Sequence, residues 1–541
     1  MKKIAKFLIV LGMMGQLSSC DYLDIVPDER AQESDTWKTE GAVRGYLYSC
    51  YGYLPANRTF GNSYWLAEEL TAVTKELFTT FKYGYYSPVS LGFTSNTWST
   101  IWNGIHQCYM FQESLKQVSN EYVTDEMKKQ YLAESNFLIA YYHFLSMRSY
   151  GPTMIIRSVI DLETPISGFP ERSSIDEVVA FINEKLDEAM SEGGLPTTWS
   201  GKDYGRATRL AALALKSRVY LYAASPLYNG NTEMYADFRS PLDGRQVIAQ
   251  EKSQAKWEIS ATQTKYAIDE VEKAKFHLYH DADAGEPSDA KPGLPNKAQR
   301  RLRYTNIDNQ TGNNPEIIWA DTRNDDYYGI QRRCPPRQTL GGKFAGISMT
   351  NCPTLQTIEA FYTKNGLPIN KDKTFDYDER YEYISAPENC DGNNYEDLVK
   401  YANFTPSSDK VMRLCTDREP RFYAWTTYHN GYFEFGKYNN EEISADPAKR
   451  AIRIHLLRDD PHGRGNRTDQ EYSISGFGNK KGVVPSAEWN VIEYPFPLFR
   501  LAELYLNYAE ALVELDRLSE AKVYLDKVRE RAGIPSVDEA W

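Results

Sequence analysis

The sequence has no apolar run as long as the roughly 20 residues that a membrane-spanning helix needs. It also lacks an excess of positive charge, since 62 Lys and Arg stand against 74 Asp and Glu, and the formal net charge is −12. An acidic chain repels phosphate backbones, so we expect no nucleic-acid partner. Cysteine is scarce as well, with 7 residues in 541, and no two of them form a C-x-x-C pair.

Six cysteines follow the first one, Cys20. In an oxidising compartment they could form disulfides, and the sequence does not select among the many pairings. Isolated buried thiols are the alternative, which we favour for Cys50 and Cys108 because both lie in helical patterns. The other four are Cys334, Cys352, Cys390 and Cys415.

The usual catalytic motifs are missing too. The chain has no G-x-S-x-G, no H-E-x-x-H and no P-loop. His277 and His280 stand three apart in a predicted helix, but no third metal ligand is near them. A calcium-loop pattern from Asn306 has Thr311 and Ile317 where Gly and Glu are required. Paired carboxylates for glycoside hydrolysis stay open, because their separation is spatial. We expect no catalytic residues, no metal and no cofactor.

The N-terminus predicts a lipid anchor. Lysines at positions 2, 3 and 6 precede a short apolar run, residues 7–14, and small residues lead to Cys20. This is the pattern of a lipoprotein signal peptide over residues 1–19, cleaved before a lipidated Cys20. Residues 20–36 would then form an extended tether. An ordinary secretory peptide with an accidental cysteine is the alternative.

Helical patterns dominate residues 37–280. Residues 129–148 are apolar nearly all round, which predicts a buried helix that ends at Gly151-Pro152. Ser174 and Glu177 form a capping box before an amphipathic stripe. Residues 206–224 and 255–279 predict two further helices.

The second half, residues 281–541, differs in character. Residues 281–490 are rich in Gly, Asn, Asp and Pro, with short strand-like runs such as 316–320 between long loops. Residues 500–515 and 519–532 predict a closing helical pair. Its Tyr505, Tyr508, Ala509, Leu512, Ala521 and Leu525 fit the tetratricopeptide pattern. A plain helical hairpin is the alternative.

Several stretches together resemble the SusD/RagB-like nutrient-binding outer-membrane lipoproteins. The likeness spans nearly the whole chain and depends on residues 20–24 with Pro27, 133–151, 205–222, 417–422 and 499–511. Two departures are visible. Ile139 stands where the family usually has Arg, and the chain stops at Trp541, where a further segment usually follows. We therefore expect a truncated C-terminal region.

The resemblance implies a mainly α fold: tetratricopeptide-like helical pairs form the scaffold of a single large body, with long irregular loops and a few short strands. It also implies a SusC-like TonB-dependent outer-membrane transporter as partner, over which the protein sits as a lid. Oligosaccharides are the usual ligands of the family, and some members take peptides.

Two tyrosine-rich segments are candidates for ligand contact. Flat rings can cover the apolar faces of sugars while polar neighbours bind the hydroxyls. Family ligand sites similarly draw aromatics from an N-terminal and a mid-chain loop. Core packing or the transporter interface is the alternative for each ring. The candidates are Trp65, Tyr83, Tyr85 and Tyr86 in the first region, and Tyr327 and Tyr328 in the second.

These expectations combine into a surface-exposed, non-enzymatic lipoprotein of the outer membrane. It would capture an oligosaccharide and deliver it to the transporter. A helical-repeat scaffold that binds peptides or stabilises the transporter, without a sugar site, is the other hypothesis. We expect Trp98, Trp102 and Trp319 to belong to the core instead of the ligand site.

Overall fold

The computed structural model describes most of the chain from residue 37 to the C-terminus. The described stretches are residues 37–55, 68–73, 84, 87, 94–161, 163–280, 282–283, 297–308, 314–323, 329–336, 349–385, 410–434, 451–465, 472–484 and 493–541. No helix in these stretches is long and apolar enough to cross a membrane.

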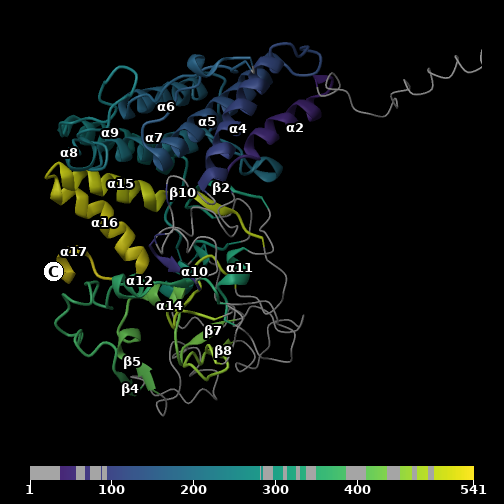
Figure 1. Cartoon of the computed structure of the whole chain (residues 1–541). Coiled ribbons are helices and arrows are strands. Elements are labelled where there is room, and N and C mark those ends of the chain that lie inside the picture. Colours follow the sequence, from purple (N-terminus) through teal and green to yellow (C-terminus); the bar gives the residue numbers. More distant parts are fainter. Residues whose placement is uncertain are drawn as a thin grey trace, which may run out of the picture.

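A row of paired α-helices forms the upper layer of the molecule in Figure 1. Each helix of the row packs on the next, and the last two come from the C-terminal end of the sequence. The row therefore contains helices from both the N-terminal and the C-terminal parts of the sequence. In order, it runs through α2 (Glu40–Tyr51), α4 (Thr94–Leu115), α5 (Asp125–Tyr150), α6 (Ile175–Ala189), α7 (Arg209–Ala224), α9 (Gln254–Lys273), α15 (Leu501–Glu514) and α16 (Leu518–Ala532).

Local capping signals explain where these helices begin. Thr124 and Thr208 each accept a hydrogen bond from the first turn of α5 and α7, and Ser174 forms the predicted capping box with Glu177. The α5 helix is buried on almost every side from Ala133 to Met147, as its sequence predicts. It ends at Gly151, whose positive φ of 72° suits a residue without a Cβ.

The prediction for residues 255–279 was wrong at its C-terminal end. The α9 helix stops at Lys273, and Lys275 adopts a left-handed conformation with φ 71°. The backbone N–H of His277 then donates to the carbonyl of Pro315 at 3.1 Å. This tertiary hydrogen bond replaces a helical one, so His277 and His280 do not lie on a helix.

The lower, loop-rich half contains short helices and pairs of short strands. Its described helices are α10 (Lys297–Tyr304), α11 (Ile330–Arg333), α12 (Leu355–Ala360), α14 (Pro420–Trp425) and α17 (Val537–Ala540). The strand pairs, all antiparallel, are β1 (Leu70–Thr71) with β3 (Cys352–Pro353), β2 (Ile317–Asp321) with β10 (Phe496–Arg500), β4 (Tyr383–Ser385) with β5 (Lys410–Met412), β6 (Thr426–Thr427) with β9 (Gly478–Asn479), and β7 (Tyr432–Glu434) with β8 (Ala451–Arg453).

The main hydrophobic core belongs to the helical row and continues into the β2–β10 pair through Trp319 and Phe499. Trp319 is buried, as predicted, and its ring meets Phe137 and Tyr141 of α5 edge-on. Trp98 and Trp102 are only partly buried. The prediction of a mainly helical single body with a few short strand pairs is confirmed.

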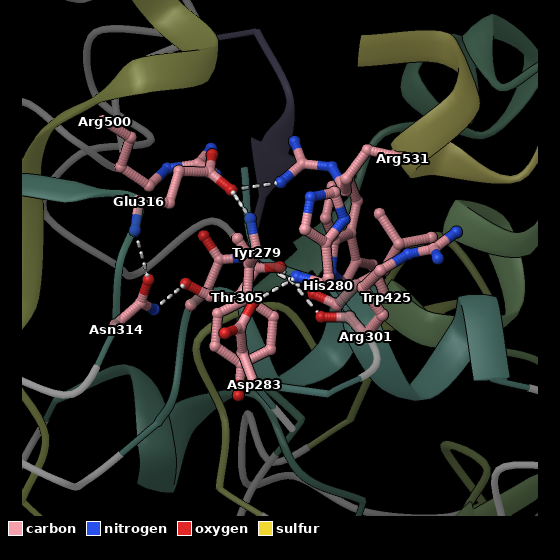
Figure 2. Close-up of polar contacts among 12 residues, drawn as sticks. Tyr279, His280, Asp283, Arg301, Thr305, Asn314, Glu316, Trp425, Arg500 and Arg531 are labelled. Carbon is pink, nitrogen blue, oxygen red and sulfur yellow. Dashed lines mark hydrogen bonds and ion pairs between the residues drawn. The ribbon is translucent and has the colours of Figure 1, made fainter. Parts of the chain in front are cut away.

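The carboxylate of Glu316 connects the middle of the chain to its C-terminal helices (Figure 2). It accepts hydrogen bonds from Arg500 at 2.8 Å, from Arg531 at 2.5 Å and from the backbone N–H of Tyr279 at 2.9 Å. Burial alone would raise the pKa of Glu316, but the two guanidinium groups hold it below its usual value. The carboxylate is therefore ionised and binds the two halves together.

Candidate functional site

The predicted contact residues fall in stretches outside the described residues. This applies to the lipidation site Cys20 and to Trp65, Tyr83, Tyr85, Tyr86, Tyr327 and Tyr328. The structure does describe the residues directly before two of these stretches, 56–67 and 324–328, and we call these residues, Leu54–Pro55 and Arg323, the stems. The geometry of those stems is therefore the part of the candidate site that can be measured.

One arginine joins the two stems. The guanidinium of Arg323, directly before residues 324–328, donates to the carbonyl of Leu54 at 2.8 Å and to that of Pro55 at 2.9 Å. Pro55 directly precedes residues 56–67. Both stretches therefore begin at the same place, although 269 positions separate Arg323 from Leu54.

Asp321 orients this arginine. Its carboxylate pairs with the Arg323 guanidinium through two hydrogen bonds of 2.7 and 2.9 Å. Burial disfavours the charged form of Arg323, yet the hydrogen bond and the charge of Asp321 hold its pKa above the usual value. A bidentate pair of this kind fixes the plane of the guanidinium, and hence the spacing of the two stems.

The residues that follow residues 56–67 also contact the mid-chain region. Strand β1 follows residues 56–67 and pairs with β3 in the register Leu70↔Pro353 and Thr71↔Cys352. Thr354 extends this contact, since its N–H donates to the carbonyl of Glu69 and its hydroxyl to that of Glu68, each at 2.9 Å. The N-terminal region and the mid-chain region thus contact each other on both sides of residues 56–67.

A pocket of about 250 Å³ lies beside the joined stems. Pro55 forms part of its wall, and the other described walls are α5, α7, Asn306, the turn at Lys481 and Gly482, and the chain around β10. Its aromatic surface comes from Tyr141, Tyr494 and Phe496. A second pocket, of about 380 Å³, lies where residues 198–208 meet β2.

The sequence motifs that carry the family resemblance mostly hold the scaffold together. Glu134 of α5 accepts from Arg206 at 2.5 and 3.2 Å and from the hydroxyl of Tyr51 at 2.6 Å. Arg218 of α7 makes two 2.6 Å hydrogen bonds with Glu503 of α15. These buried or half-buried partners link helices, so the motifs report the fold and not the ligand.

The Asp-Arg-Glu-Pro-Arg segment has the same structural role. Arg418 donates to the backbone carbonyls of Leu414, Ile358 and Phe361 at 2.6 to 2.7 Å. Burial lowers the pKa of Arg418 to about 10. Glu419 accepts from the N–H of Tyr362 at 2.7 Å, so this segment organises the loop-rich half.

The described cysteines, Cys50, Cys108, Cys334, Cys352 and Cys415, are all buried free thiols. Cys50 and Cys108 are therefore buried free thiols, as expected, but they are not isolated, because the two side chains contact each other. Within the described stretches no cluster of His, Cys, Asp or Glu is arranged to hold a metal ion. His277 and His280 stack their rings at 5.5 Å, and His277 faces Asp283 at 3.3 Å.

Two pocket residues were missed by the sequence analysis. Arg148, near the end of α5, and Lys481, after β9, both line the 250 Å³ pocket. Neither belongs to a recognisable motif. Only the packing of segments more than 300 positions apart brings them together, so no local signal could have found them.

Comparison with known proteins supports the resemblance. Residues 315–541 match the family model described as the SusD family, and residues 21–221 match the one described as "Starch-binding associating with outer membrane". The solved structure named BT4246 is 27% identical, with a TM-score of 0.74, and the match covers 92% of this chain and 83% of that one. A search of curated proteins found no match.

More distant structures share the fold. A SusD-like protein from Bacteroides fragilis is 20% identical with a TM-score of 0.64, over 94% of this chain and 82% of that one. Surface glycan-binding protein A from Bacteroides fluxus is 17% identical with a TM-score of 0.52, over 93% and 84%. The chain belongs to the SusD/RagB family, since models of that family match residues 21–221 and 315–541.

Proposed function

We propose that this protein is a lipid-anchored receptor on the cell surface that captures an oligosaccharide and delivers it to a SusC-like TonB-dependent transporter. Residues Trp65, Tyr83, Tyr85, Tyr86, Tyr327 and Tyr328 would supply the rings that cover the sugar. Acyl chains on Cys20 would hold the receptor at the outer membrane.

The Arg323 bridge is the observation that best supports this proposal. Two tyrosine-rich regions are distant in sequence, yet the stretches at Trp65 and at Tyr327 begin at stems joined by one guanidinium. Rings that follow two stems in contact would be able to cover adjacent units of one sugar chain. Rigid stems reduce the entropy that such loops lose on binding, which favours affinity.

Calorimetry on the full-length protein in detergent tests ligand binding. We expect binding to at least one member of a panel of plant and host polysaccharides. The variants W65A, Y83A and Y327A should bind roughly tenfold more weakly, because each lost ring contact is worth about 1 kcal/mol or more. Tyr122, which is 36% exposed on the helical layer, gives a matched control as Tyr122→Ala. Binding that none of the three ring variants weakens would contradict the proposal.

Peptides added to the same panel test the second hypothesis. A protein that binds peptides but no polysaccharide would be a helical-repeat scaffold. Co-purification of a TonB-dependent transporter with the tagged protein tests the partner. Cys20→Ala tests the anchor, since the variant should leave the membrane fraction.

A further inference from the structure

The pocket beside the joined stems carries an unusual charge. Four cationic residues line it: Arg148 of α5, Arg218 of α7, Arg500 at the end of β10, and Lys481. None of its described lining residues is acidic. Three of the elements that line it, α5, α7 and β10, are labelled in Figure 1.

Two of the four cations, Arg218 and Arg500, have acidic partners. Arg218 forms a bidentate pair with Glu503, with both hydrogen bonds at 2.6 Å. Arg500 shares the carboxylate of Glu316 with Arg531, so two guanidinium groups there face a single negative charge. The net charge of this group of three side chains, Arg500, Arg531 and Glu316, is therefore positive.

Arg148 and Lys481 have no acidic partner among the described residues. Arg148 lies over the ring of Phe144 at 5.9 Å, and the ammonium of Lys481 lies 4.6 Å from the ring of Trp425. Both side chains are half-buried. A half-buried cation without an ion-pair partner is unfavourable, and an anion that enters the pocket would reduce that penalty.

The protonation of Lys481 reflects this environment. Burial, together with the nearby Arg500 and Arg421, lowers the pKa of Lys481 to about 8. An anion bound beside it would stabilise the ammonium and raise that pKa. The ionisable groups that face Lys481 are Arg500, Arg421, Arg531 and Glu69, and the pocket adds Arg148, Arg218, Tyr141 and Tyr494.

We propose that this pocket binds the carboxylate or sulfate group of an acidic sugar unit. Guanidinium forks match the oxygen geometry of both groups, and the rings of Tyr141, Tyr494 and Phe496 offer flat apolar faces to the sugar. The volume of about 250 Å³ is below the roughly 300–1,000 Å³ of drug-sized sites, which fits one sugar unit.

This inference rests on the proposed glycan-binding function and narrows its substrate class to acidic glycans. Pro55 connects the two, because it lines the pocket and directly precedes the stretch that contains Trp65.

Calorimetry with matched probes tests the proposal. The probes are trigalacturonic acid, its methyl ester, a sulfated chondroitin disaccharide, its unsulfated form, and sodium sulfate alone. The wild type should bind the better charged probe at least tenfold more tightly than its less charged counterpart. Arg148→Gln and Lys481→Met should each reduce that preference by about tenfold, and Lys481→Arg should keep it. Lys202→Met, an exposed lysine outside the pocket, is the control.

A pH series separates binding from a structural role. The affinity of the wild type for the charged probes should fall between pH 7 and pH 9, because Lys481 loses its proton in this range. The Lys481→Arg variant should show no such fall. Each charge-removing variant should melt within a few degrees of the wild type, since it deletes an uncompensated charge. Equal affinity for charged and less charged probes would overturn this inference and leave the proposed function standing. Binding of sulfate without binding of any glycan would overturn both, because the pocket would then hold an adventitious ion only.

Discussion

His143 is a buried histidine whose partners determine its protonation. His143 belongs to α5. Its Nδ1 lies 2.7 Å from the carbonyl of Ile139, and its Nε2 accepts from the backbone N–H of Ile156 at 3.3 Å. One ring nitrogen must donate and the other must accept, so the neutral tautomer with the proton on Nδ1 fits. Burial lowers the pKa of His143 to about 4, and the charges of Lys185 and Arg157 act in the same direction.

This lowered pKa predicts acid sensitivity. The unfolded chain binds the proton near pH 6.5 and the folded chain only near pH 4. The contribution to stability is therefore complete above pH 6.5 and is lost as pH falls toward 4, by about 3 kcal/mol. Urea titrations of wild type and His143→Gln from pH 7.5 to 4 measure this. The variant should lose that part of the pH slope, and His106→Gln, an exposed histidine on α4, should retain it.

Cys108 is a buried thiol that should resist chemical modification. Its thiol is buried against Cys50, and burial raises its pKa well above the usual value. The reactive thiolate is then absent at neutral pH. We expect a thiol reagent to modify Cys108 only after urea unfolding. Rapid modification in native buffer, followed by mass spectrometry of the peptide, would contradict the buried environment.

At the scale of elements, Glu134 and Arg206 link α2, α5 and the segment before α7. Glu134 is fully buried, and it receives both Arg206 and the Tyr51 hydroxyl. Glu134→Gln should lower the free energy of unfolding by about 3 kcal/mol, because the guanidinium loses its buried counter-charge. Glu184→Gln, which breaks an exposed pair with Arg157, should change it by about 1 kcal/mol or less. Equal losses in the two variants would argue against a special role for the buried pair.

The hydrogen bonds of Arg323 to Leu54 and Pro55 should fix the spacing of the two stems. Lysine cannot reach Asp321 and two carbonyls at once, so Arg323→Lys should loosen the stems. We expect the glycan affinity to fall roughly tenfold while the melting temperature changes by only a few degrees. Arg245→Lys, at a comparably exposed arginine that pairs with Asp243 and Glu171, is the control. An unchanged affinity would show that the stems do not organise the ligand site.

At the scale of the whole molecule, Glu316 holds the C-terminal helices to the mid-chain. Glu316→Gln leaves Arg500 and Arg531 without their shared carboxylate, and should destabilise the protein by about 3–5 kcal/mol. The folded pKa of Glu316 is lowered, so its contribution is present above about pH 4.5 and is lost as pH falls below that. Calorimetric melting at pH 7 and pH 4 should show a smaller pH effect in the variant. A melting curve unchanged at pH 7 would refute this role.

The sequence by itself determined the features that depend on neighbouring residues. Apolar periodicity and caps such as Ser174–Glu177 predicted the helices, and the all-round apolar pattern predicted a buried α5. The closing helical pair was also predicted, and α15 and α16 end within a residue of the expected positions. These signals are local, because capping and helical hydrogen bonds span only three or four residues.

Only the tertiary structure decided where α9 ends and which charges lie together. The helix stops early because His277 bonds to Pro315, and the stems meet because Arg323 reaches Leu54. Arg148 and Lys481 share a pocket for the same kind of reason. Such contacts join residues tens to hundreds of positions apart, and their energies depend on burial, which a linear pattern of residue types does not specify.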